Sequence, residues 1–295
     1  HAHVDALARP CVVKADGLAA GKGVAMCEDA AAAHASIDEM MGEKRFGDAG
    51  DRVVVEEWLR GEEASYYAIC DGERIVTLAA AQDHKRLLVG DRGPNTGGMG
   101  AFVPSPIADA ALVDRIAAEV LAPTFAALAA EGRPYRGVLF AGMMLTAAGP
   151  KVIEFNCRFG DPETQAVLPL LETDLYDVFD ACLDGTLAEL AIEWSADAAA
   201  TVVMASAGYP VSSSPSVPIT GLDEAGRRGC TVFHAGTALV DGVATTAGGR
   251  VLAVTARRRT LADAANAAHA GVAAIDFDGA QHRNDIARAT AEVHA

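Results

Sequence analysis

The stretch VVKADGLAAGKGVAM, residues 12–26, combines glycines with two lysines, as phosphate-binding loops do. Glycines let backbone N–H groups approach an anion closely, and a lysine supplies a mobile positive charge. The spacing differs from that of a P-loop, because only three residues separate Gly17 from Gly21, and Gly23 stands where the metal-binding hydroxyl belongs. We therefore expect any metal ion that accompanies a phosphate here to be bound by another segment.

A candidate metal pair lies in KVIEFNCRFGDPETQ, residues 151–165. In a strand, alternate side chains share a face, so Glu154 and Asn156 would point together while Ile153 and Phe155 face the packed side. A carboxylate and an amide oxygen suit a hard cation that also binds phosphates. The same pattern fits an ordinary solvated strand face. Arg158, which could bind a phosphate or carboxylate through two parallel hydrogen bonds, and two further carboxylates follow at once and favour a binding site.

Two other segments have the composition of ligand sites. An apolar strand that ends in acidic residues, VVVEEWLRGEEAS at 53–65, could bind an adenosine moiety, although a solvated acidic turn has the same composition. Residues 82–104 read as a long loop that carries Asp83, His84, Lys85 and Arg86, followed by several glycines. Loops of this length are usually functional or disordered. We interpret His84 as an organiser of the loop rather than as a catalytic residue.

The elements that must position these residues form a mixed α and β pattern. Strands are predicted at 10–14, 24–27 and 52–59, and hairpins at 64–80, with an Asp71-Gly72 turn, and at 137–156. Helices are predicted at 28–41, at 109–131 with a break at Pro123, at about 175–183 before Gly185, and from Thr260 with a capping box to Asp263. In the first helix, one apolar face is expected to hold Ala33, Ile37, Met40 and Met41.

The bulk composition excludes several classes of protein. The 295 residues are enough for two or three domains, and no apolar run reaches the length of about 20 residues that spans a membrane. A net charge of −16 argues against a general nucleic-acid binder. Six widely spaced cysteines without a C-x-x-C pair argue against a zinc site or a disulfide framework and favour a reducing, cytoplasmic location.

Taken together in this order, five segments resemble the phosphoribosylamine–glycine ligase family of ATP-grasp enzymes. These segments are KADGLAAGKG from Lys14, EEWLRGEEAS from Glu56, QDHKR from Gln82, GPNTGGMGA from Gly93 and EFNCRFGDPETQ from Glu154. The resemblance runs from about residue 10 to residue 290 and includes FHAGT from Phe233, GRVLAVTA from Gly249 and RNDI from Arg283.

The resemblance implies a role for each matching residue. ATP would be contacted by Lys14, Gly21, Lys22, Gly23, Glu56, Glu57, Leu59 and Glu63, with the loop around Lys22 closing over the triphosphate. Mg²⁺ or Mn²⁺ would be held by Glu154 and Asn156. The acceptor side would be lined by Asp83, Lys85, Arg86, Asn95, Gly98 and Arg158, and catalysis would involve Lys22, Arg158 and Asp161.

The resemblance also implies the fold and the reaction. We expect an α/β (α+β) chain with an ATP-grasp domain of antiparallel sheets at 1–192 and a smaller β-rich domain at 193–295. The implied reaction joins glycine to 5-phosphoribosylamine through glycyl phosphate, giving glycinamide ribonucleotide, ADP and phosphate in purine biosynthesis. The implied enzyme is a cytoplasmic monomer with small-molecule substrates and no nucleic-acid or membrane partner.

The sequence departs from the family pattern at its start and in one strand. The family's separate N-terminal domain and the beginning of its ATP-grasp domain have no counterpart here, so we expect a fragment whose activity alone would be incomplete. The strand before the metal pair reads FAGMM and offers no further carboxylate, which leaves more positions on the metal ion for water. Two alternatives therefore stay open: another ATP-grasp carboxylate–amine ligase or carboxylase, and a nucleotide-binding chain without full activity.

Overall fold

The computed structural model describes residues 1–7, 9–19 and 23–288. The chain folds into two compact units, His1–Gly61 (the N-terminal unit) and Glu62–Ala295 (the C-terminal unit). All pairings between named strands in the described ranges are antiparallel, in agreement with the expected fold class. Within the same ranges, no helix is both long and apolar enough to cross a membrane.

The N-terminal unit is a three-stranded sheet of order β2-β1-β3 with a helix packed on it. Val13, Ala33, Ile37 and Met40 are buried in its core, but Met41 is 38% exposed, so its predicted place on the apolar face is wrong. The reason is that the helix widens to a π-turn at residues 38–42, which rotates Met41 away from the core. Its elements are α1 (Ala2–Leu7), β1 (Cys11–Ala15), β2 (Val24–Cys27), α2 (Ala30–Ile37), η1 (Asp38–Gly42), η2 (Gly47–Gly50) and β3 (Val53–Glu57).

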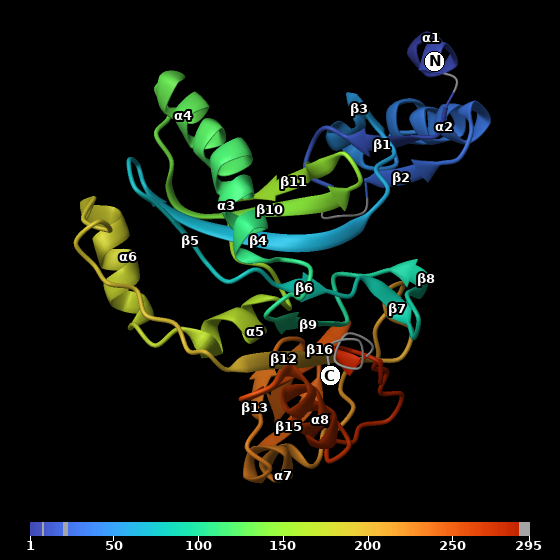
Figure 1. Cartoon of the computed structure of the whole chain (residues 1–295). Helices are drawn as coiled ribbons and strands as arrows, with labels where there is room; N and C mark the ends of the chain where they lie inside the picture. The colour runs from blue at the N-terminus through green and yellow to red at the C-terminus, as the bar shows by residue number, and fades with distance from the viewer. Residues whose placement is uncertain (8, 20–22, 289–295) are drawn as a thin grey trace. The chain divides into compact units, whose positions relative to one another are not determined.

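The C-terminal unit begins with a four-stranded sheet of order β11-β10-β4-β5, which contains both predicted hairpins. Because strand side chains alternate, Tyr66 and Ala68 of β4 pack toward α3 and α4, whereas Tyr67 and Ile69 pack toward α5 and α6 (Figure 1). Its elements are β4 (Glu62–Asp71), β5 (Ile75–Thr77), α3 (Ala110–Ile116), η3 (Ala117–Leu121), α4 (Ala122–Ala130), β10 (Arg136–Thr146), β11 (Gly149–Asn156), α5 (Thr164–Val167), η4 (Leu168–Leu170) and α6 (Leu175–Asp184).

A second, five-stranded sheet has the order β13-β16-β12-β9-β6 and packs against α8. Residues 82–104, expected as one irregular loop, contain four short strands: β6 (Gln82–Asp83), β7 (Arg86–Leu88), β8 (Arg92–Asn95) and β9 (Gly100–Val103). Their strand character comes from pairing with distant segments, since β9 binds β12. The remaining elements are β12 (Ala198–Ala205), α7 (Leu222–Arg227), β13 (Thr231–His234), β14 (Thr237–Val240), β15 (Val243–Thr246), β16 (Arg250–Arg258) and α8 (Leu261–Val272).

The five-stranded sheet joins segments from both sides of the domain boundary expected near residue 193. Strands β6 and β9 precede that position, and β12, β13 and β16 follow it. Ala199 on β12 is also part of the core that lies beneath the four-stranded sheet. The boundary itself stays a prediction, but the two sheets share one continuous packing arrangement within the C-terminal unit.

Several local predictions are confirmed by cap geometry. The Thr260 side chain accepts a hydrogen bond from the Asp263 backbone N–H at the start of α8. Gly185 ends α6 in the left-handed conformation, at a φ of 78°. The predicted break near Pro123 corresponds to the π-turn η3, which directly precedes α4. These signals depend only on neighbouring residues, which explains why they could be predicted.

The core of the five-stranded sheet can be tested with two matched leucines. Leu252 on β16 is fully buried, whereas Leu239 on β14 is 75% exposed. Leu252→Ala should lower the free energy of unfolding by about 2–5 kcal/mol, because it removes buried apolar contacts and leaves a cavity. Leu239→Ala should change it by no more than about 0.5 kcal/mol. Denaturant unfolding of both variants measures the difference, and equal effects would contradict the assigned core.

Candidate functional site

A small hollow in the C-terminal unit brings together side chains from both sheets. It is open to solvent and lies where β4, β10 and β11 approach β6 and the residues that follow it. Its charged lining residues are Glu63, Asp83, Lys85 and Glu154, and its other lining residues are Ala64, Ser65, Phe140, Gly142, Met143 and Ile153. Four residues that the sequence analysis selected therefore lie in one place.

The hollow carries an excess of negative charge. Lys85 Nζ donates a hydrogen bond to Asp83 Oδ2 at 2.5 Å, which neutralises one of the three carboxylates. Two carboxylates, Glu63 and Glu154, remain, so the formal charge of the lining is −3 + 1 = −2. Such a site favours a divalent cation or an ammonium group.

The pKa values of the hollow follow from this crowding. Removal from water raises the pKa of the Glu63 carboxyl; Lys85 opposes that shift, and the neighbouring carboxylates of Asp83 and Glu154 add to it. Burial lowers the pKa of Lys85, but Asp83 and Glu163 outweigh burial and raise it overall. Lys85 therefore stays protonated, and any cation that enters the hollow will favour the ionised form of Glu63.

Glu154 and Asn156 point to the same side of β11, as expected. Asn156 Nδ2 donates a hydrogen bond to Glu154 Oε1 at 3.1 Å, and rotation about the last bond of the amide would present its oxygen at the same place. Glu154 is exposed and Asn156 is half-buried, so neither group is sealed in an apolar interior. A carboxylate and an amide oxygen beside an excess of negative charge fit the donor set of Mg²⁺.

The prediction that Ile153 and Phe155 face the packed side is wrong. Ile153 lines the hollow together with Glu154, and Phe155 is 40% exposed. A β-bulge is the cause: Gly142 pairs with Glu154, but Met143 pairs with Val152, which leaves Ile153 as an extra residue. A bulge breaks strict alternation and re-aims side chains, a device that is common beside active sites.

The glycine-rich segment after β8 is packed against the segment that carries Asp161. Gly98 has a φ of +117°, and a Cβ built on it would lie 2.4 Å from Pro162 Cδ. Arg250 Nη1 donates to the carbonyls of Gly97 and Asp161 at 2.9 Å and 2.7 Å, and its Nη2 donates to Asp161 Oδ2 at 3.0 Å. Only glycine permits this close approach, and Arg250 holds the two segments together.

In the N-terminal unit, Lys14 lies on β1, and Glu56 lies on the neighbouring strand β3, opposite Val12 and therefore diagonal to Lys14. Lys14 Nζ forms an ion pair with Glu56 Oε2 at 2.6 Å, with side chains 17% and 37% exposed. Gly23 accepts a hydrogen bond from the Ala15 backbone N–H at 2.8 Å, so the ends of the β1–β2 turn are close together. Gly21 and Lys22, which were predicted to contact phosphate, lie outside the described residues.

Comparison with known proteins gives the same family as the sequence segments, over nearly the whole chain. Residues 1–164 match the family described as phosphoribosylglycinamide synthetase, ATP-grasp (A) domain, and residues 199–289 match the C domain of the same synthetase. The chain belongs to the phosphoribosylamine–glycine ligase family. Its fold is therefore the ATP-grasp fold, and the family consists of ATP-dependent ligases.

Individual relatives give the extent of the similarity. A phosphoribosylamine–glycine ligase of Ralstonia nicotianae is 50% identical over 287 residues, which are 97% of this chain and 68% of that protein. A trifunctional purine biosynthetic protein of Homo sapiens is 52% identical over 276 residues, which are 93% of this chain and 27% of that protein. The crystal structure of a Thermotoga maritima phosphoribosylamine–glycine ligase superposes with a TM-score of 0.87 at 34% identity, covering 97% of this chain and 71% of that one.

Not all predicted site residues of this family member line the hollow. Among the described residues, Arg86 and Asn95 face each other as a pair across β7 and β8, and Asp161 is bound by Arg250. The Arg158 guanidinium donates to the carbonyl of its neighbour Phe159 at 2.8 Å. Glu57 lies at the end of β3, and Leu59, just beyond it, is half-buried.

Sequence reasoning missed several residues that organise the candidate site. Tyr209 accepts a hydrogen bond from the Gly97 N–H at 2.9 Å, and Arg250 binds the same segment. Glu163 is almost fully buried and accepts a hydrogen bond from Ser65 Oγ at 3.2 Å; burial and Asp83 raise its pKa. Glu163 and Arg250 lie in segments that resemble the family, so the resemblance could have pointed to these two residues.

The contact between Gly98 and Pro162 gives a test of the glycine segment. Gly98→Ala should cost about 1–3 kcal/mol for backbone strain and about 1–3 kcal/mol more for the overlap with Pro162. Gly132→Ala is the matched control, because Gly132 has a φ of +73° with nothing within 4 Å of a built Cβ. That control should cost only about 1–2 kcal/mol. Denaturant unfolding compares them, and equal losses would show that the close approach is unimportant.

Proposed function

We propose that this chain carries the ATP-dependent ligation of glycine to 5-phosphoribosylamine, a step of purine biosynthesis. Membership of the ligase family supports the proposal, and the observation that carries it is the hollow with its charge of −2 and the Glu154–Asn156 pair at its edge. The chain covers about two thirds of its single-function relatives and about a quarter of the trifunctional ones, so the activity of the whole protein belongs to the proposal.

The proposed chemistry has two steps. The glycine carboxylate attacks the γ-phosphorus of ATP, which releases ADP and forms glycyl phosphate. The amine of phosphoribosylamine then attacks the acyl carbon, the phosphate leaves, and an amide bond forms. Both steps bring anionic groups together, so the task of the side chains is to supply positive charge and to hold the reactants in place.

Each predicted site residue has a place in this proposal. In the N-terminal unit, the nucleotide would be contacted by Lys14, Gly21, Lys22, Gly23, Glu56, Glu57 and Leu59. In the C-terminal unit, Glu63 would bind the ribose of ATP, and the acceptor side would be formed by Asp83, Lys85, Arg86, Asn95, Gly98, Arg158 and Asp161. Glu154 and Asn156 would hold Mg²⁺ or Mn²⁺, and the ion would supply positive charge to the phosphate oxygens when it is bound.

An assay of ADP release separates this function from its alternatives. ADP release that requires both glycine and phosphoribosylamine supports the proposal. Turnover with another amino acid would favour a different carboxylate–amine ligase, and turnover with bicarbonate would favour a carboxylase. Calorimetric binding of ATP without any turnover would indicate a nucleotide-binding chain that lacks full activity. We further propose a cytoplasmic monomer, and the thiols of all six cysteines are free in this structure.

Removal of the metal-binding carboxylate is the most direct test of the site. Glu154→Gln keeps the shape of the side chain but loses its charge, so glycine-dependent ADP release should fall on the order of 100-fold and require more Mg²⁺. Glu189→Gln, at another exposed glutamate of the same unit, is the matched control and should behave like the unmodified chain. A Glu154→Gln variant with an unchanged rate and unchanged Mg²⁺ dependence would refute the assignment.

The role of Lys14 can be tested by nucleotide binding alone. Lys14→Met removes a charge-assisted hydrogen bond to phosphate, which should raise the ATP dissociation constant about tenfold or more in calorimetry. Lys44→Met is the matched control, because Lys44 is also paired with a carboxylate, Asp51, in the N-terminal unit. The control should bind ATP like the unmodified chain. Equal affinities for both variants would argue against Lys14 as a phosphate ligand.

A further inference from the structure

Arg283 is a buried cation in the segment after α8. Its hydrogen-bond partners are Asp285, in the same segment, and two residues of the β7–β8 hairpin, Arg86 and Asp91. The Arg283 side chain is 1% exposed. Nε and Nη2 donate to the two carboxylate oxygens of Asp285 at 2.8 Å and 2.7 Å, and Nη1 donates to Asp91 Oδ1 at 2.6 Å. A buried guanidinium is costly unless it is fully paired, so this arrangement strongly favours one geometry of its partners.

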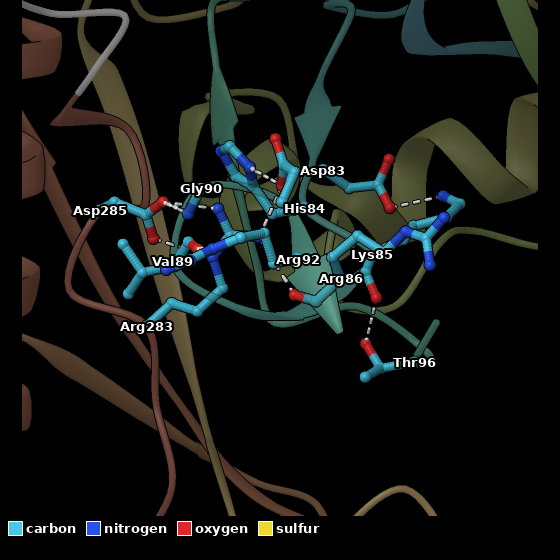
Figure 2. Close-up of polar contacts among 11 residues, drawn as sticks. Asp83, His84, Lys85, Arg86, Val89, Gly90, Arg92, Thr96, Arg283 and Asp285 are labelled. Carbon is cyan, nitrogen blue, oxygen red and sulfur yellow. Dashed lines mark hydrogen bonds and ion pairs between the residues drawn. The ribbon is translucent and has the colours of Figure 1, made fainter. Parts of the chain in front are cut away.

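Arg283 and its partner Asp285 bind the β7–β8 hairpin at its first residue and at its turn. Arg283 Nη1 also donates to the carbonyl of Arg86 at 3.0 Å, which is the first residue of β7. Asp285 Oδ2 accepts a hydrogen bond from the Gly90 N–H at 2.9 Å, at the turn of the hairpin. Figure 2 shows Arg283 and Asp285 beside Arg86 and Gly90. The hairpin is therefore fixed by residues almost 200 positions later in the chain.

The same hairpin begins next to a cation of the hollow. Lys85 precedes Arg86 directly, and its carbonyl accepts hydrogen bonds from Thr96 N–H and Oγ1 at 2.8 Å and 2.7 Å (Figure 2). Its ammonium group is paired with Asp83 in the hollow. Two successive backbone carbonyls are thus held: Thr96 binds the carbonyl of Lys85, and Arg283 binds the carbonyl of Arg86.

We propose that Arg283 is a positioning residue that fixes Arg86, whose guanidinium donates to the carbonyl of Gly93 at 2.8 Å, for an anionic group on the acceptor side. That group is either the carboxylate of glycine or the phosphate of phosphoribosylamine. The inference rests on the proposed function. Arg283 itself does not touch the reactants: it sets the backbone from which Arg86 projects, and Asp91 and Asp285 complete its coordination.

The test measures the KM of each reactant separately in an Arg283→Lys variant. Lysine keeps the charge but cannot bind Asp285 through two parallel bonds and also reach Asp91 and the Arg86 carbonyl. The KM for glycine or for phosphoribosylamine should rise about tenfold, while the KM for ATP stays within about twofold and kcat within about threefold. Which of the two rises identifies the anionic group that Arg86 binds.

Arg257→Lys is the matched control. Arg257 on β16 also binds two carboxylates, Asp197 and Glu172, and one backbone carbonyl, that of Pro169. Its loss should leave all three KM values unchanged. The proposal is overturned if Arg283→Lys leaves the KM of both acceptor-side reactants unchanged, or if it lowers kcat without any selective change in KM, as a purely structural role would.

A second variant covers the case in which Arg283→Lys does not fold. Asp91→Asn alters a side chain that is 62% exposed and removes one charged partner of Arg283 while Asp285 remains. It should raise the same KM about threefold. Circular dichroism shows whether the variant is folded. A folded Asp91→Asn variant with no rise in KM would overturn the proposal. Failure of the proposed function is separate, since it would appear as absent glycine- and phosphoribosylamine-dependent ADP release in the unmodified chain.

Discussion

Three carboxylates and one ammonium group share the small hollow between the two sheets of the C-terminal unit, and their unequal number governs the chemistry proposed for it. Lys85 can neutralise only one carboxylate, and it is paired with Asp83. Glu63 and Glu154 keep their charges in a partly dry site, where like charges repel. In the proposed function, a divalent ion that also binds phosphates would offset this repulsion.

The backbone of β11 sets where Glu154 lies relative to the hollow. The bulge at Ile153 turns Glu154 toward the hollow, next to Gly142 on the paired strand. A Cβ built on Gly142 would lie 3.5 Å from Glu154 Cγ, which is an ordinary van der Waals contact, so the bulge rather than the glycine sets the position of Glu154.

The acceptor side depends on residues from the end of the chain. Arg250 joins the Gly97 segment to Asp161, and Arg283 joins the β7–β8 hairpin to Asp285. Both arginines belong to segments that follow β12, and they act through backbone carbonyls as well as carboxylates. Both arginines lie in the range that matches the C domain, whereas in the proposed function the nucleotide and metal contacts come from the first part of the chain.

The sequence by itself determined the features that depend on neighbouring residues. Hairpins at Asp71-Gly72 and at residues 137–156, the cap at Thr260, the end of α6 at Gly185 and the shared side of Glu154 and Asn156 could all be predicted, because turn geometry, capping and strand alternation act over a few residues. The order of five long motifs was also sufficient to identify the ligase family. No structural knowledge was needed for either result.

Only the tertiary structure decided which distant groups meet. Residues 82–104 read as a loop, since their strands exist through pairing with β12 and with one another. The exposure of Phe155 and the position of Ile153 depend on a register shift against β10, and the burial of Arg283 depends on Asp91, 192 positions earlier. Such contacts are set by packing of the whole unit, because a hydrogen bond or a bulge across strands depends on the partner's position and not on local sequence.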